Sequence, residues 1–155
     1  MYNLIGIEKV KAEKLVIELN DLLANYQIFY QNLRGFHWNI KGNKFFELHL
    51  KFEELYNDAV IKVDEIAERI LTLEGTPLHM MDDYIKVSDI KSINSKGIEV
   101  EAVNHVINNF SVLIKKERAI LILSGEADDE GTNSLMSDYI SQSEKTVWML
   151  NSYMK

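Results

Sequence analysis

Four long amphipathic segments constrain what this chain can fold into. Apolar residues recur at alternating three- and four-residue steps over about 7–35, 45–74, 98–126 and 133–154. This spacing puts them on one face of an α-helix, which a folded protein buries. The second segment carries the stripe Phe45, Leu48, Phe52, Leu55, Ala59, Val63, Ile66, Ile70 and Leu73. No strand-like alternation and no internal repeat accompanies these segments, so the sequence predicts an all-α fold.

The breaks between the segments predict how the helices connect. Turn-forming residues separate the segments at 39–43, 75–77, 94–97 and 128–132. The connection between the second and third helices is about twenty residues long and has room for a short helix at 82–87. A connection of that length has to cross the bundle, which makes these two helices parallel. We therefore expect residues 1–155 to form a single domain, a four-helix bundle with one long crossover.

Composition and charge narrow the class of protein. Apolar residues make up 46% of the chain and charged residues 26%, as in globular proteins. With no run of eighteen apolar residues and no charged-then-apolar leader, we expect a cytoplasmic protein without membrane spans. The absence of cysteine excludes disulfides and thiolate metal sites, which leaves oxygen and nitrogen ligands. A net charge of −7 disfavours nucleic acid and favours cations, although solubility alone also explains it.

Two pairs of potential metal ligands lie along the second segment. His49 and Glu53 are four residues apart, as are Asp64 and Glu68, so each pair projects from one side of a helix. The pairs share one face but lie about 16 Å apart at 1.5 Å of rise per residue, too far for both to bind one ion. Two such helices packed antiparallel about a twofold axis would bring each pair against the partner's other pair. The competing interpretation is a solvated polar face, the commoner state of a helix acid.

Motifs along almost the whole chain resemble those of the Dps family, the miniature ferritins named as DNA-binding proteins from starved cells. The motifs are HWNIKG at 37–42, FFELH at 45–49, FEELY at 52–56, DEIAERI at 64–70, DY at 83–84, SDIK at 88–91, GT at 131–132 and EKTVWML at 144–150. The resemblance implies a ferritin-like bundle that assembles, from antiparallel dimers, into a hollow dodecamer. It agrees with the bundle and crossover predicted from the helix pattern.

The resemblance also implies a ferroxidase centre shared between two subunits. One subunit would supply His37, His49 and Glu53, and its twofold-related partner Asp64 and Glu68. Position 53 is often aspartate in the family, so the longer glutamate here puts the ligand geometry at that position in doubt. Members of the family bind Fe(II) there, oxidise it with hydrogen peroxide or more slowly with dioxygen, and store ferric mineral. Zinc can stand in for iron, and the alternative is a cage without catalysis, or one that shelters DNA, with zinc-occupied or empty sites.

Further candidate residues have two interpretations each. Trp38, beside a predicted ligand, would donate an electron when one iron reacts alone, but packing at the subunit interface is the favoured interpretation. One turn contains three acids, Asp128, Asp129 and Glu130. They would either line a pore for Fe(II) or simply cap a helix, and the two interpretations are equally supported. Residues 1–8 contain no lysine or arginine, and the charge is acidic. We therefore expect no appreciable binding of duplex DNA.

Overall fold

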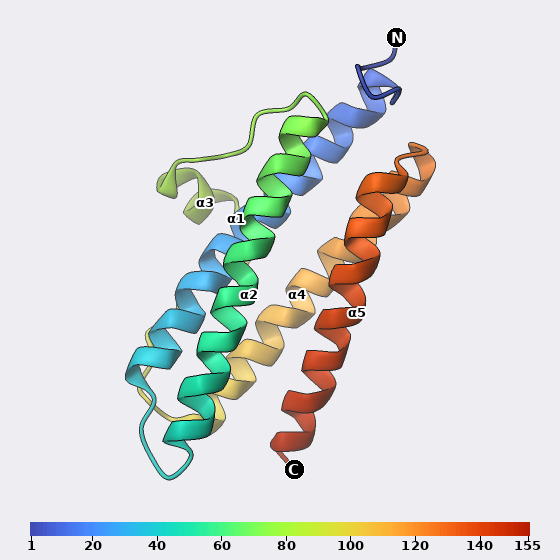
Figure 1. Cartoon of the computed structure of the whole chain (residues 1–155). Helices are drawn as coiled ribbons and strands as arrows, with labels where there is room; N and C mark the ends of the chain where they lie inside the picture. The colour runs from blue at the N-terminus through green and yellow to red at the C-terminus, as the bar shows by residue number, and fades with distance from the viewer.

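The computed structural model describes residues 1–155 as five helices without a sheet (Figure 1). The helices are α1 (Lys9–Asn39), α2 (Phe45–Thr72), α3 (Met81–Val87), α4 (Glu99–Glu126) and α5 (Glu130–Tyr153). One isolated β-bridge joins Tyr2 to Glu8 in the N-terminal loop. The predicted all-α fold is confirmed, and so is the short helix in the connection.

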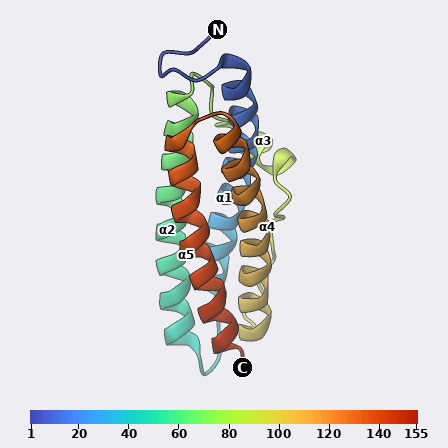
Figure 2. The same ribbon diagram turned by 90° about the vertical axis from the view of Figure 1, so that its right-hand side faces the viewer.

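The four long helices pack side by side as a bundle. α1 lies along α2, α4 lies along α5, and the two pairs meet chiefly where α1 contacts α4 (Figures 1 and 2). The crossover, with α3, runs along α1 from the end of α2 to the start of α4, so α2 and α4 run in the same direction. No helix of the chain is both long enough and apolar enough to cross a membrane.

The core is a single cluster of 32 buried apolar residues to which all five helices contribute. Aromatic rings also join the helices: Phe29 of α1 meets Phe110 of α4 edge to face, with 5.0 Å between the ring centroids. Phe36 of α1 lies 5.8 Å from Phe52 of α2. Burying each such ring contributes about 1.5–3 kcal/mol, which is why the stripes seen in the sequence face inward.

Two helix ends differ from the sequence-based expectation. α1 continues to Asn39, four residues past the predicted end at Gly35, because Gly35 keeps an ordinary helical backbone rather than the left-handed conformation that ends many helices. α5 begins at Glu130 instead of about 133. The Asp129 carboxylate accepts a hydrogen bond from the backbone N–H of Thr132, 3.0 Å away, and so caps the helix.

Two buried asparagines of α1 hold the irregular crossover in place. The Asn25 side-chain oxygen accepts hydrogen bonds from the hydroxyl of Ser88 and from the backbone N–H groups of Asp89 and Ile90, at 3.0–3.1 Å. Seven residues further along α1, Asn32 makes the same kind of contact with backbone groups of residues 91 and 93. A loop buried against a helix needs such partners, because an unpaired buried amide costs about 1–3 kcal/mol.

Candidate metal centre

Two histidines face each other where the end of α1 meets the start of α2. The rings of His37 and His49 stack with centroids 3.7 Å apart and planes inclined by 14°. Nδ1 of His37 lies 2.6 Å from the backbone oxygen of His49, and Nδ1 of His49 lies 2.8 Å from the backbone oxygen of His37. A carbonyl oxygen only accepts, so both Nδ1 atoms donate. In the neutral imidazoles this leaves both Nε2 lone pairs available for a metal ion.

Neighbouring aromatic residues fix the orientation of the two imidazoles. His37 is buried, and the ring of Tyr56 meets it edge to face at 5.3 Å. His49 is half-buried, with Phe45 stacked on it at 4.9 Å. Because the reciprocal hydrogen bonds and these contacts hold both rings, the pair is preorganised before any ion arrives.

The three carboxylates of the predicted site lie along α2 and remain free. Glu53 is half-buried one turn beyond His49, whereas Asp64 and Glu68 are exposed further along the helix. None of the three forms an ion pair within the chain. Free carboxylates on a helix surface are available to cations. The rise of the helix, however, keeps Asp64 and Glu68 about 16 Å from His49 and Glu53.

The single chain does not complete a metal site. Nowhere does it gather three or more His, Asp or Glu side chains close enough to hold one ion. The structure brings His37 and His49 together and keeps Asp64 and Glu68 apart from them, as the spacing in the sequence requires. Any site using all five ligands therefore needs a second chain.

An exposed apolar stripe accompanies the ligands along α2. Phe46 is 84% exposed and Leu71 58% exposed, and three more large apolar side chains lie between them. These are Leu50, Val60 and Ile61. At 100° per residue all five fall on the same side of the helix as Glu53 and Asp64. An apolar stripe of this length on one helix marks a surface that another protein surface covers.

The secondary candidates occupy different environments. Trp38 is 60% exposed next to His37, with the guanidinium of Arg34 5.2 Å above its ring. Asp129 is buried and its carboxylate is already occupied by protein donors. It caps α5, and its Oδ1 accepts a hydrogen bond from Nη2 of Arg69 at 2.6 Å. Asp128 and Glu130 on either side of it are exposed, so only these two remain free to meet an incoming cation.

A buried polar pair inside the bundle was not singled out as functional from sequence. Glu117 of α4 is completely buried, and the Tyr26 hydroxyl of α1 donates to its Oε1 at 2.6 Å. Burial raises the pKa of Glu117 to about 7. The signal in the sequence was a glutamate on the otherwise apolar stripe of 98–126, a position where a charge is costly.

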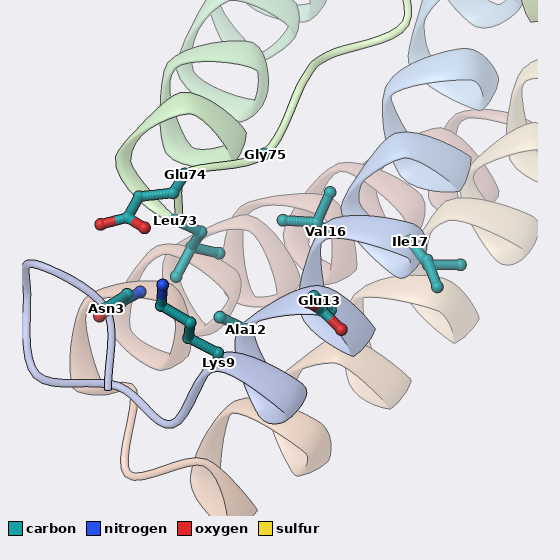
Figure 3. A pocket seen from close by; sticks show the side chains of 9 residues that line it. All are labelled: Asn3, Lys9, Ala12, Glu13, Val16, Ile17, Leu73, Glu74 and Gly75. Atoms are coloured by element: carbon teal, nitrogen blue, oxygen red, sulfur yellow. The ribbon is translucent and has the colours of Figure 1, made fainter. Parts of the chain in front are cut away.

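A pocket of about 500 Å³ lies at the far end of α2 from the histidines (Figure 3). The N-terminal loop, the first turns of α1 and the end of α2 enclose it, with Lys9, Glu13 and Glu74 at its edge. Apolar side chains such as Val16 and Leu73 line the remainder. It contains no histidine and no cluster of acids, so it is separate from the candidate metal centre.

Comparisons with known proteins agree with this architecture. The ferritin-like domain family matches residues 17–155. The crystal structure of a Dps protein from Vibrio cholerae O1, described as a member of the ferritin-like diiron-carboxylate superfamily, superposes with a TM-score of 0.97 at 51% identity. The superposition covers 99% of this chain and 97% of that one. The Dps structure from Bacillus brevis gives a TM-score of 0.89 at 34% identity over 96% and 99% of the two chains.

Curated sequences point the same way. The DNA protection during starvation protein of Porphyromonas gingivalis is 42% identical over 148 residues, covering 96% of this chain and 93% of that protein. An uncharacterised protein of Haemophilus influenzae is 49% identical over 145 residues, covering 94% and 91%. Fold, crossover and sequence thus agree along nearly the whole length, and the chain belongs to the Dps family of ferritin-like proteins.

Proposed function

We propose that this protein oxidises Fe(II) with hydrogen peroxide at centres shared between two subunits and stores the ferric product inside a dodecameric cage. The observation that carries the proposal is the histidine pair with both Nε2 atoms free, next to the side of α2 that bears the three unpaired carboxylates of Glu53, Asp64 and Glu68. Membership of a family of ferritin-like proteins supports an iron substrate.

A single antiparallel register completes the ligand set. If α2 packs against a second α2 so that His49 lies opposite Glu68 of the partner subunit, Glu53 comes to lie opposite the partner's Asp64. The same register sets Phe46 opposite the partner's Leu71, which covers the two ends of the apolar stripe. One geometry therefore buries the exposed apolar residues and completes two identical sites, as an isologous contact requires.

The ligand types suit transient binding of iron. Imidazole nitrogen and carboxylate oxygen hold Fe(II) while leaving positions open for peroxide, unlike a closed four-ligand structural site. The negative charge of the carboxylates favours the more highly charged Fe(III) product. Two Fe(II) ions give two electrons to one hydrogen peroxide, which with two protons yields two Fe(III) and two waters. The pairing of electrons avoids the release of hydroxyl radical.

Individual residues take distinct roles in this proposal. His37 and His49 bind the metal through Nε2, and Glu53 adds a carboxylate one methylene longer than aspartate, which reaches further from the helix. Asp64 and Glu68 supply carboxylate ligands to the site that contains the partner's histidines. Zinc, which accepts the same ligands, would compete for the site without undergoing oxidation.

The site assignment is tested by Asp64→Ala combined with Glu68→Ala. We expect a loss of at least tenfold in the initial rate of Fe(II) oxidation by peroxide, followed by stopped-flow absorbance, in a variant that still elutes as the wild-type cage. Glu101→Ala with Asp138→Ala removes the same charge from exposed positions outside the site and should leave the rate unchanged. An assembled Asp64/Glu68 variant with the wild-type rate would overturn the assignment.

Sheltering of DNA is the second candidate, because the name of the Porphyromonas gingivalis relative describes DNA protection. A net charge of −7 on every chain opposes it, since contact with phosphates depends on lysine and arginine. We expect the metal-free protein to leave duplex DNA unshifted in a gel at physiological salt. A clear shift under those conditions would favour the second candidate.

A further inference from the structure

The bundle encloses a tyrosine bound to a carboxyl group that the proposed iron chemistry does not use. Tyr26 is 1% exposed, and its hydroxyl donates to Oε1 of Glu117 at 2.6 Å. The other oxygen of Glu117, Oε2, has no hydrogen-bond partner. Burial, followed by the nearby Glu117 charge, raises the pKa of Tyr26 well above its ordinary value, so this tyrosine keeps its proton. A buried, half-satisfied carboxyl group is costly, so a purely structural explanation for it is poor.

Aromatic rings connect this pair to the candidate metal centre. The His37 ring contacts Tyr56 at 5.3 Å between centroids, and Tyr56 contacts Tyr30 at 6.0 Å, both edge to face. Tyr30 and Tyr26 are one turn apart on α1, about 6 Å along the helix axis. Two ring contacts and one turn of α1 therefore link His37, a candidate metal ligand, to Tyr26 in the core.

The charges along this route favour Tyr26 as its end point. The guanidinium of Arg34 lies 4.7 Å above the Tyr30 ring, and the ammonium of Lys62 lies 5.2 Å from the ring of Tyr139, the next tyrosine beyond Tyr26. A cation over a ring disfavours loss of an electron from that ring. Tyr26 instead has a carboxyl group on its hydroxyl, which can take the proton that an oxidised phenol releases.

We propose that Tyr26 is an internal one-electron donor that serves the iron centre through Tyr56 and Tyr30 and passes its hydroxyl proton to Glu117. The inference rests on the proposed function. Tyr26 gives up its electron when a centre holds a single Fe(II). Hydrogen peroxide then takes one electron from Fe(II) and one from Tyr26. Its O–O bond breaks, and two protons from solvent complete two waters. The Tyr26 O–H bond breaks as its proton joins the Glu117 carboxylate, leaving Fe(III), a neutral tyrosyl radical and a protonated carboxyl group.

The consequence is that a half-loaded centre consumes peroxide without releasing hydroxyl radical. The unpaired electron comes to rest on a ring that is closed off from solvent and from neighbouring molecules.

The test is freeze-quench electron paramagnetic resonance of the assembled protein, loaded with one Fe(II) per centre and mixed with peroxide. Wild type should give a tyrosyl signal, and Tyr26→Phe should lower it at least fivefold while raising spin-trapped hydroxyl radical. Tyr84→Phe is the matched control, because that tyrosine lies in α3 off the route and donates to the Leu78 carbonyl. The tyrosyl signal of Tyr84→Phe should equal that of wild type. An undiminished signal in Tyr26→Phe would overturn the inference.

A second arm separates this inference from the proposed function. Metal-free protein is oxidised by flash-generated tris(bipyridine)ruthenium(III), which needs no iron site, and the radical is followed by the same resonance. A Tyr26-dependent signal here, with none from iron and peroxide, would support the tyrosine as donor while refuting the ferroxidase centre. Absence of a Tyr26-dependent signal in both arms would refute the inference itself. Tyr26→Phe could lose its signal through misfolding, because it removes the hydrogen bond to Glu117. Tyr30→Phe keeps that hydrogen bond and should still lower the iron-driven signal, so it tests the route independently.

Discussion

Replacing Glu117 with glutamine should change how the stability of the protein depends on pH. Burial is the main cause that raises the pKa of this carboxyl group from its ordinary 4.5 to about 7, against smaller lowering effects of the Tyr26 hydrogen bond and the Lys62 and Arg118 charges. The folded state therefore holds the proton more tightly than the unfolded state. At 1.36 kcal/mol per pH unit, the difference amounts to about 3 kcal/mol per chain.

The direction of the effect follows from linkage. Below pH 4.5 both states are protonated and the group does not oppose folding. Between pH 4.5 and about 7 the unfolded chain ionises first, so the free energy of unfolding falls, and above pH 7 it stays about 3 kcal/mol lower. Glutamine does not titrate. The free energy of unfolding of Glu117→Gln, minus that of wild type, should therefore grow by about 3 kcal/mol from pH 4 to pH 8.

Urea denaturation followed by circular dichroism at 222 nm measures this difference at each pH. Protein concentration has to be the same throughout, because association between chains contributes to the apparent stability. Glu101→Gln, at an exposed position, is the control and should give a curve parallel to that of wild type. If the Glu117→Gln curve also ran parallel to wild type between pH 4 and pH 8, the reasoning about the buried carboxyl group would be refuted.

Three further substitutions test the interface, the turn and the crossover. Leu71→Asp places a charge on the apolar stripe of α2, and size-exclusion chromatography should show smaller species instead of the wild-type assembly; an unchanged elution volume would contradict the stripe as an interface. Asp129→Ala removes the cap of α5 and leaves the Arg69 guanidinium without its carboxylate, so we expect chemical denaturation to report a loss of about 3–5 kcal/mol. A loss below 1 kcal/mol would show that water replaces this pair. Asn25→Ala leaves the amide of Ile90 unpaired, and hydrogen exchange at that amide should speed up with a loss of about 2 kcal/mol in stability; unchanged exchange would indicate another acceptor.

The helices and their order could be predicted because helical burial is a local, periodic property. Four segments with three- and four-residue spacing became α1, α2, α4 and α5, and the twenty-residue connection became the crossover with α3. Of the two helix ends that differed, the start of α5 depended on a contact from elsewhere in the chain. The start of α5 is set by Asp129, whose carboxylate is held by Arg69 from α2, more than fifty residues away in sequence.

The candidate site, like the fold, could be predicted from the sequence only in part. Spacing along one helix determined that His49 and Glu53 share a face with Asp64 and Glu68, and that one chain cannot join the two pairs. It did not determine how the imidazoles are held. His37 and His49 belong to different helices, and only their packing sets the reciprocal hydrogen bonds that leave each Nε2 free.

By itself, then, the sequence determined an all-α bundle, the parallel direction of its second and third long helices, and the ligand-bearing face of α2. These follow from the geometry of a single helix and the length of a connection. Only the tertiary structure decided that Asp129 is a committed cap, that the histidines bind each other's backbone, and that Glu117 meets Tyr26 inside the core. Each of these depends on which side chains meet between helices, and there burial and hydrogen bonding set the chemistry of a group.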